Sequence, residues 1–260
     1  MNILALQLDI AWEDKAANFA KVRRLLAAAK PAPQTLVVLP ELFAIGFSLN
    51  TEATAETSPG ETELFLAATA REFGVGVVAG AAVRGADGRV RNNALAFSST
   101  GERLAAYAKM RPFTLGGEAR HFTAGEQPTT FVWCGATVAP FVCYDLRFPE
   151  IFRAVTAAHR PQLFTVIANW PQKRIHHWVR LLQARAIENQ AYVVGVNRCG
   201  RDPDHIYNGR SLVIDYHGGI LADAGDGERA VCQELDLAAL ENYRREVPFL
   251  DDLRAMTIGG

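Results

Sequence analysis

The chain has 260 residues, of which 49% are hydrophobic and 21% are charged, and its formal net charge at pH 7 is −1. This composition is typical of a soluble globular protein that buries a large core without help from disulfides or metal ions. The near-neutral charge argues against nucleic acid as a partner, the first ten residues do not form a signal peptide, and the longest weakly polar run is too short to span a membrane.

In the first half of the chain, apolar strand segments alternate with amphipathic helix segments. Pro31 and Pro33 end the first of these helices. The run Ser58-Pro59-Gly60-Glu61 predicts a capping box for the second helix, with Pro at its first position. The sequence GADGR predicts a hairpin turn. Strands are expected at 3–8, 35–39, 75–82, 90–98 and 103–108, and helices at 15–29 and from the capping box to about 73.

The second half of the chain repeats this order of elements. Strands are expected at 136–142, 163–168, 192–197, 209–215 and 219–223, and helices at about 149–159 and 175–190. Each half therefore has the order β-α-β-α-β-β-β, although the two sequences are not similar. No linker separates the halves, so we expect one domain over residues 1–260. Such a pattern predicts an α/β protein, either with two sheets packed in four α-β-β-α layers or with one doubly wound sheet.

The cysteines and histidines do not indicate a metal site. None of the cysteines forms a CxxC or a Cys/His cluster with zinc-like spacing. His176 and His177 are adjacent and point to different faces of a predicted helix. We expect free thiols, a cytoplasmic protein and no cofactor, with three cysteines as small core or strand residues. These three are Cys134, Cys199 and Cys232.

Three residues with chemical potential each follow a predicted strand. Glu41 follows TLVVLP, Lys109 follows RLAAYA, and Cys143 follows ATVAPFV. Taken singly, each has a simpler explanation: an exposed loop carboxylate, a surface lysine and an inert buried cysteine. Active groups nevertheless collect beyond the carboxyl ends of strands in α/β sheets. Together the three supply a base, a positive charge for an oxyanion and a thiol nucleophile.

Several motifs in matching order resemble the nitrilase superfamily of carbon–nitrogen hydrolases, and its ω-amidase-like branch in particular. They are LVVLPELFAIGF, YAKMRPFTLGGEARHF, FVCYDLRFPEIFR and ANWPQKRIHHWVRLLQARAIENQAYV. The resemblance covers about residues 3 to 220. Three separate motifs each place one member of a Glu-Lys-Cys triad, which makes the likeness specific.

The resemblance implies the four-layer α-β-β-α sandwich and a role for each triad residue. Cys143 would be the nucleophile, Glu41 the general base, and Lys109 the oxyanion partner together with the backbone N–H of Tyr144. Glu118, in GGEARHF, matches a second acidic residue that positions the lysine and the substrate amide; its alternative is a loop carboxylate without a role.

Residues around the triad have less specific assignments. Tyr144, Trp170 and Phe113 are candidate substrate-binding residues, although aromatic residues at strand ends are more often part of the core. Asp145 and Arg147 are expected to pair and shape the turn after Cys143. The run Met110-Arg111-Pro112 departs from the family pattern, which affects the expected substrate preference rather than the chemistry, and Arg185 and Glu188 are expected to form a helix pair.

The function that the resemblance implies is hydrolysis of the terminal amide of a small ω-amido acid, such as α-ketoglutaramate or succinamate, through a thioester. The expected partner is thus a small-molecule amide substrate, and a homodimer is expected, with residues 242–260 packing across its interface or along the monomer. The alternatives are an N-carbamoyl amidohydrolase, another carbon–nitrogen hydrolase such as a nitrilase, and a catalytically silent binding or scaffold protein.

Overall fold

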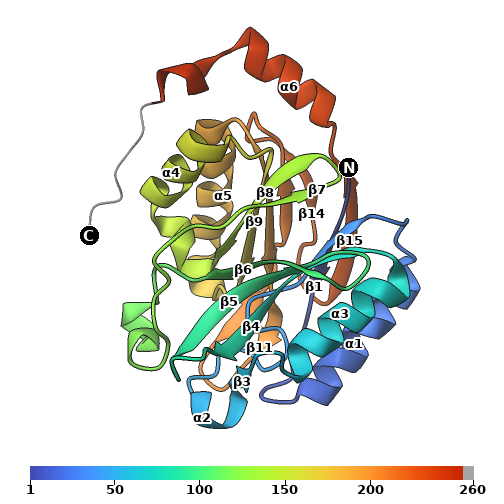
Figure 1. Ribbon diagram of the computed structural model, residues 1–260, viewed down its shortest axis with the longest axis vertical. Coiled ribbons are helices and arrows are strands. Elements are labelled where there is room, and N and C mark those ends of the chain that lie inside the picture. The colour runs from blue at the N-terminus through green and yellow to red at the C-terminus, as the bar shows by residue number, and fades with distance from the viewer. Residues whose placement is uncertain (254–260) are drawn as a thin grey trace.

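The computed structural model describes residues 1–253, which form two sheets packed face to face with helices on their outer faces (Figure 1). The sheets meet along one core, and the helices α1 and α3 lie on one outer side while α4 and α5 lie on the other. The helices are α1 (Lys15–Ala29), α2 (Thr51–Thr54), α3 (Glu61–Phe73), α4 (Pro149–His159), α5 (Ile175–Asn189) and α6 (Leu237–Glu246).

The first sheet has the strand order β15-β1-β2-β4-β5-β6, with β3 paired to β4. Its strands are β1 (Asn2–Gln7), β2 (Leu36–Val38), β3 (Glu56–Thr57), β4 (Gly76–Arg84), β5 (Val90–Phe97), β6 (Arg103–Ala108) and β15 (Arg229–Glu234). Strands β1, β2 and β4 are parallel, whereas β5 and β6 return as antiparallel hairpins.

The second sheet has the order β14-β13-β10-β9-β8-β7 and repeats this plan. Its strands are β7 (Phe131–Trp133), β8 (Ala136–Val142), β9 (Leu163–Ala168), β10 (Tyr192–Asn197), β13 (Leu212–Ile214) and β14 (Ile220–Asp223). A separate ribbon pairs β11 (Cys199–Arg201) with β12 (Ile206–Asn208). Strands β8, β9 and β10 are parallel, as β1, β2 and β4 are. Because the strands divide between two sheets that share one core and carry helices on their outer faces, the predicted four-layer architecture is confirmed and the doubly wound alternative is wrong.

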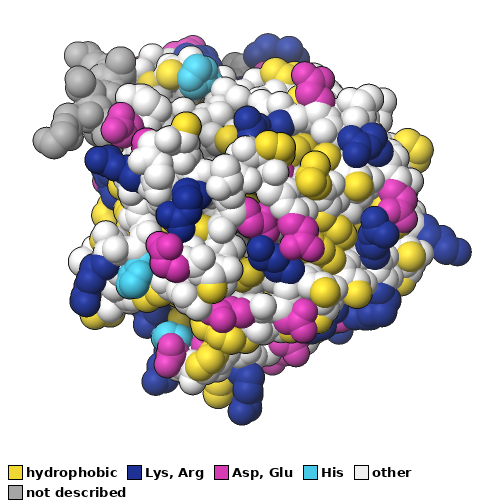
Figure 2. Space-filling model, turned by 60° about the horizontal axis from the view of Figure 1, so that its bottom comes forward, with side chains coloured by type: hydrophobic (Ala, Val, Ile, Leu, Met, Phe, Trp, Pro, Cys, Tyr) yellow, Lys and Arg dark blue, Asp and Glu magenta, His cyan; other side chains and the backbone are white. Residues whose placement is uncertain are grey.

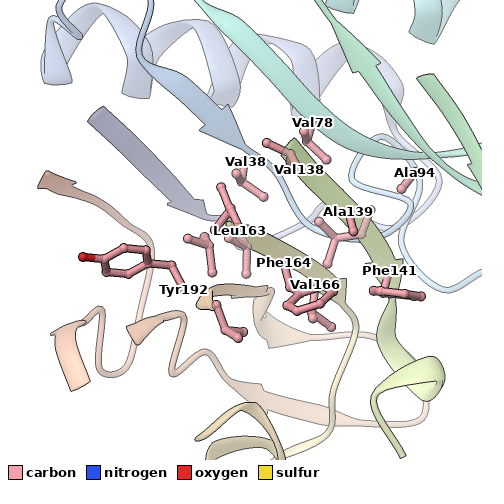
Figure 3. Packing of buried hydrophobic residues seen from close by; sticks show 14 of the residues in the cluster. Val38, Val78, Ala94, Val138, Ala139, Phe141, Leu163, Phe164, Val166 and Tyr192 are labelled. Carbon is pink, nitrogen blue, oxygen red and sulfur yellow. The ribbon is translucent and has the colours of Figure 1, made fainter. Parts of the chain in front are cut away.

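The side chains of β1 point alternately into two different layers of the apolar core. Ile3 and Ala5 belong to the core between the sheets, while Leu4 and Leu6 pack with the residues of α1 and α3. Successive side chains of a strand point to opposite faces, so a strand buried on both sides needs apolar residues throughout. Figure 3 shows the core between the sheets, where Val38 faces the side chains of β8 and β9.

The sequence predictions for the helices and most strands are confirmed to within two residues, but three details are wrong. The helix α3 begins at Glu61 with Gly60 as its N-cap, because the Glu56 carboxylate rather than Ser58 accepts from the Thr62 N–H, at 2.8 Å. Strand β13 is shorter than predicted because Gly209 and Arg210 adopt the left-handed backbone conformation, which a strand excludes.

The third detail is a set of elements that were not predicted: the short α2, β3, β7 and the β11–β12 ribbon, and, in the C-terminal region, β15 and α6. Strand β15 pairs with β1 along six residues, so the chain returns to the sheet in which it began. Helix α6 packs along the monomer, where Arg244 donates to the carbonyl oxygens of Arg160, Pro161 and Gln190. Residues 254–260, which the expectation for the C-terminal segment includes, lie outside the described residues.

The surface reflects the balanced charge of the sequence. On the face that Figure 2 shows, acidic and basic side chains are interspersed with hydrophobic ones. Within residues 1–253, no helix has both the length and the hydropathy that crossing a membrane requires.

Because β4 lies close to the segment that follows β2, we predict that Gly80 does not tolerate replacement by a residue with a side chain. A Cβ there would lie 2.3 Å from Leu42 N and 2.5 Å from Glu41 Cα, which are backbone atoms that side-chain motion cannot relieve. We expect Gly80→Ala to lower the free energy of unfolding by about 1–3 kcal/mol, measured by urea denaturation.

The matched control is Gly219→Ala, where the nearest atoms belong to the partly exposed Asp215 side chain. A Gly80→Ala protein as stable as this control would show that β4 has room for a methyl group there.

Candidate active site

Four strand ends from the two sheets meet at one edge of the sandwich. In the first sheet, β2 is followed by Glu41 and β6 by Lys109; in the second, β8 is followed by Cys143 and β9 by Asn169. Strand β6 runs in the same direction as β2, since two antiparallel pairings separate it from β4. The three residues that the sequence singled out are therefore brought together, as the strand-end rule predicts.

A sharp turn presents Cys143 at the end of β8. Its φ is 46°, in the left-handed region that costs a residue with a side chain of order 1 kcal/mol, and a 3-10 turn over Cys143–Arg147 begins there. The Asp145 carboxylate braces this turn by accepting from Val142 N at 3.1 Å, Arg111 N at 2.9 Å and Tyr107 OH at 2.8 Å. Burial raises the pKa of Asp145 to about 7, against the effect of these donors and of a nearby lysine.

The expected pair of Asp145 with Arg147 is wrong. Asp145 is fully buried and its oxygens are occupied by the three donors of the turn. The Arg147 guanidinium instead stacks on Trp170, with 4.6 Å from Cζ to the ring centroid. The arginine that braces the turn is Arg185, which donates to Leu146 O at 2.7 Å in addition to its predicted pair with Glu188.

Glu41 is fully buried and held by donors from both sheets. Its Oε1 accepts from Lys109 Nζ at 2.9 Å and from Asn92 Nδ2 at 2.7 Å, and its Oε2 accepts from the Asn169 N–H at 2.8 Å. The alternative of an exposed loop carboxylate is therefore wrong. Such a fixed carboxylate keeps one orientation, which is what a general base requires.

Lys109 lies between two carboxylates. Its Nζ donates to Glu41 at 2.9 Å and to Glu118 at 2.8 Å, and only 2% of its side chain is exposed. Burial alone would lower the pKa of Lys109, but the charges of Glu118 and Glu41 outweigh it and raise that pKa above its ordinary value. The ammonium is therefore permanently charged, as an oxyanion partner must be.

Glu118, the second predicted acidic residue, is buried and belongs to the same ion cluster. It accepts from Lys109, from Asn92 Nδ2 at 2.8 Å and from the Phe113 N–H at 2.6 Å. Asn92 thus bridges both carboxylates and fixes their separation.

The surroundings of the Cys143 thiol favour its protonated form. Burial raises the pKa of the Cys143 thiol well above its ordinary value, the charge of Glu41 raises it further, and Lys109 opposes both. A protonated thiol is a weak nucleophile, so attack on a carbonyl requires a base that removes the proton at that moment. Glu41 is the carboxylate whose charge acts most strongly on this thiol.

A cavity of about 420 Å³ opens in front of the cluster. Cys143, Lys109 and Asn169 line it, and so do Phe113, Tyr144 and Trp170, the three aromatic residues that the sequence suggested for substrate binding. Its volume suits a small molecule and is far below what a protein segment would need. Tyr144 is the second residue of the 3-10 turn, and the backbone N–H at this position has no acceptor within the turn.

Sequence reasoning missed two asparagines of this site. Asn169 holds Glu41 through its N–H and also donates from Nδ2 to Glu41 O at 2.8 Å, while Asn92 joins Glu41 to Glu118. Asn169 directly follows β9, so the strand-end rule could have found it. Asn92 lies within β5, and no local signal marks it.

The remaining cysteines lie apart from the cluster. Cys199 is buried and Cys232 is a strand residue, as expected, although Cys232 is exposed; Cys134 is exposed and lies outside any strand, so its assignment as a core or strand residue is wrong. Cys134 occupies a surface turn with a φ of 47°, and Cys232 lies on β15. Within the described residues, no group of three or more potential ligands has the arrangement of a metal site.

Comparison with known proteins agrees with this geometry. The family model named carbon-nitrogen hydrolase matches residues 3–245. The chain belongs to the carbon–nitrogen hydrolase family. This carbon–nitrogen hydrolase is 34% identical over 253 residues to the 2-oxoglutaramate amidase of Bacillus subtilis, covering 97% of each chain. It is 37% identical over 258 residues to the omega-amidase YafV of Yersinia enterocolitica, covering 97% of this chain and 96% of that one.

A solved structure has the same architecture. A CN-hydrolase superfamily protein of Xanthomonas campestris, with an arsenic adduct in its active site, aligns with a TM-score of 0.94 and 32% identity, covering 100% of this chain and 99% of that chain. The predicted nitrilase-like fold is confirmed. The protein is a hydrolase that acts on carbon–nitrogen bonds other than peptide bonds, so the scaffold alternative is wrong.

The electrostatics of the cluster predict the ionisation of the thiol. We expect Cys143 to stay protonated at neutral pH, because its pKa is raised. Glu41→Gln removes one of the negative charges responsible and leaves Lys109 in place, so the thiol of this variant should ionise at a lower pH. The measurement is the ultraviolet absorbance of the thiolate against pH, taken as the difference from Cys143→Ala. A wild-type thiol that ionises as readily as an ordinary cysteine would contradict the account.

Proposed function

We propose that this carbon–nitrogen hydrolase is an ω-amidase, which converts the terminal amide of a small ω-amido acid, such as α-ketoglutaramate or succinamate, to the acid and ammonia. Two relatives of nearly full-length similarity are named 2-oxoglutaramate amidase and omega-amidase. The observation that carries the proposed chemistry is the buried ion cluster of Glu41, Lys109 and Glu118 beside Cys143, at the inner end of a small cavity.

The first half of the reaction transfers the acyl group to the enzyme. Glu41 takes the proton of the Cys143 thiol while the sulfur attacks the amide carbon. The carbonyl oxygen becomes an oxyanion, stabilised by Lys109 Nζ and the Tyr144 N–H. When the tetrahedral intermediate collapses, the carbon–nitrogen bond breaks, Glu41 gives its proton to the leaving nitrogen, and ammonia departs from a thioester.

The second half of the reaction releases the acid. Glu41 takes a proton from a water molecule, whose oxygen attacks the thioester carbon and forms a second oxyanion at the same donors. The carbon–sulfur bond then breaks, and the Glu41 proton returns to the sulfur of Cys143. Glu118 acts through Lys109, because it holds the ammonium in place between two carboxylates.

We also propose that the chain forms a single domain and that the protein is a cytoplasmic homodimer. The single domain is supported by the pairing of β15 with β1 and by the core shared between the sheets. Free, exposed Cys134 and Cys232 support a reducing compartment. The outer face of α5 supports an interface, since Ile187 is 55% exposed there.

Removal of the thiol tests the nucleophile. We expect Cys143→Ala to reduce ammonia release from succinamate by at least about 10³-fold, because no other group can form the thioester. Cys232→Ala, which removes an exposed thiol, should keep wild-type activity. Undiminished release by Cys143→Ala would contradict the assignment. A wild-type protein that cleaves N-carbamoyl compounds or nitriles but no ω-amide would show that the proposed substrate class is wrong.

The dimer predicts an effect of charge on α5. We expect Ile187→Glu to shift the protein toward the monomer in sedimentation velocity, because a carboxylate in an apolar interface loses its hydration. Leu64→Glu, on the outer face of α3 where Leu64 is 60% exposed, should leave the sedimentation coefficient unchanged. A wild-type protein that sediments as a monomer at all concentrations would exclude the proposed dimer.

A further inference from the structure

Two arginines line the same cavity as Cys143 and have no carboxylate partner. Arg147 ends the 3-10 turn that Cys143 begins, and Arg174 lies directly before α5. Among residues 1–253, no Asp or Glu oxygen lies within 4.0 Å of either guanidinium, whereas Arg185, for example, pairs with Glu188 at 3.0 Å. Two unpaired cations that line one cavity indicate an anionic ligand, because guanidinium groups bind carboxylates in a two-pronged geometry.

The acidic residues of the cavity do not neutralise this pair. Asp202 accepts from Tyr207 OH and from two backbone N–H groups within its own loop. Glu13 accepts from Ser48 Oγ at 2.5 Å. Asp204 also lines the cavity, on the β11–β12 ribbon, and makes no ion pair with either arginine.

A single tryptophan contacts both arginine residues, Arg147 through its guanidinium and Arg174 through its backbone. The Arg147 guanidinium lies over the Trp170 ring, 4.6 Å from its centroid, and Trp170 Nε1 donates to Arg174 O at 2.8 Å. Trp170 is 2% exposed, and its own N–H is anchored by Asn197. Arg174 also lies over Phe113, at 5.7 Å. The Arg147 guanidinium is therefore packed on Trp170 and the Arg174 guanidinium on Phe113, and this preorganisation lowers the entropy cost of binding a ligand.

The two arginines also repel each other. Burial, and then the charge of Arg174, lower the pKa of Arg147. The neighbouring His177 has a lowered pKa as well, from burial and from the positive charges around it, so its neutral Nδ1 can accept from Arg147 at 3.4 Å. An anion between the guanidinium groups would relieve this repulsion, whereas a neutral ligand would not.

We infer that Arg147 and Arg174 bind the carboxylate at the far end of the substrate, with Trp170 positioning Arg147 and Phe113 positioning Arg174. The inference rests on the proposed function, which it deepens by assigning the second recognition site. Arg147 follows Cys143 by four residues in one rigid turn, so the distance from the thiol to the carboxylate site is fixed. A substrate with an amide at one end and a carboxylate a few carbons away would fit, and a neutral amide of equal length would leave two cations unpaired.

The test compares succinamate with succinamide, a neutral diamide of the same length. We expect wild-type protein to favour succinamate in kcat/KM, and Arg174→Met and Arg147→Met each to reduce this preference about 10- to 100-fold, as expected for the loss of one charge-assisted pair. The change should appear mainly in KM for succinamate. The matched control is Lys173→Met, which removes an equal charge from an exposed neighbour outside the cavity.

An unchanged preference in both arginine variants would overturn the inference, and so would an equal loss in Lys173→Met. A second measurement does not need turnover: calorimetric binding of succinate to Cys143→Ala. We expect binding to be lost when Arg174→Met is added and kept when Lys173→Met is added. If succinate fails to bind Cys143→Ala, the carboxylate site is wrong; if it binds as expected but the wild-type protein cleaves no ω-amide, the proposed function alone is wrong.

Discussion

The ion cluster of Lys109 with Glu41 and Glu118 is the constraint on which the rest of this structure depends. Three charges without access to water are stable only if every partner is in place, and removing one partner of such a cluster costs about 3–5 kcal/mol. The asparagines complete the cluster, since Asn92 donates to both carboxylates and Asn169 to Glu41. Because Asn169 follows a strand of the second sheet and Glu41 a strand of the first, the ion cluster also ties the two sheets together.

The cluster forms only where two sheets meet. Lys109 and Glu41 come from the first sheet, whereas Cys143 and Asn169 come from the second. The core between the sheets fixes their relative position, and the small side chains Ala94, Ala96 and Ala105 allow the sheets to approach closely. Burial therefore acts on the ion pairs and on the thiol at once: the same surroundings that strengthen the ion pairs raise the pKa of the Cys143 thiol.

The turn after β8 connects this chemistry with recognition. It begins at Cys143 in a left-handed conformation, is braced by Asp145, and ends at Arg147. The Cys143 sulfur and the Arg147 guanidinium are thus parts of one short rigid segment. Trp170 connects this segment to Arg174, because it packs on the Arg147 guanidinium and donates to the Arg174 carbonyl oxygen. Strain at the nucleophile is tolerated because the surrounding hydrogen bonds allow the backbone no alternative.

The sequence by itself determined the helices α1, α3, α4 and α5, most of the longer strands, the four layers through the family resemblance, and the strand-end positions of Glu41, Lys109 and Cys143, because these depend on local periodicity and motif spacing. It did not determine the pairing of β15 with β1, since contacts between distant segments leave no local pattern.

For the same reason the sequence misassigned Asp145 and Arg147. Opposite charges two residues apart suggested a pair, but in the packed chain Asp145 accepts from Tyr107 and from two backbone N–H groups, and Arg147 stacks on Trp170. Only the tertiary structure decided which charges are buried together and which face the cavity, because that choice depends on the desolvation of each group in the packed chain.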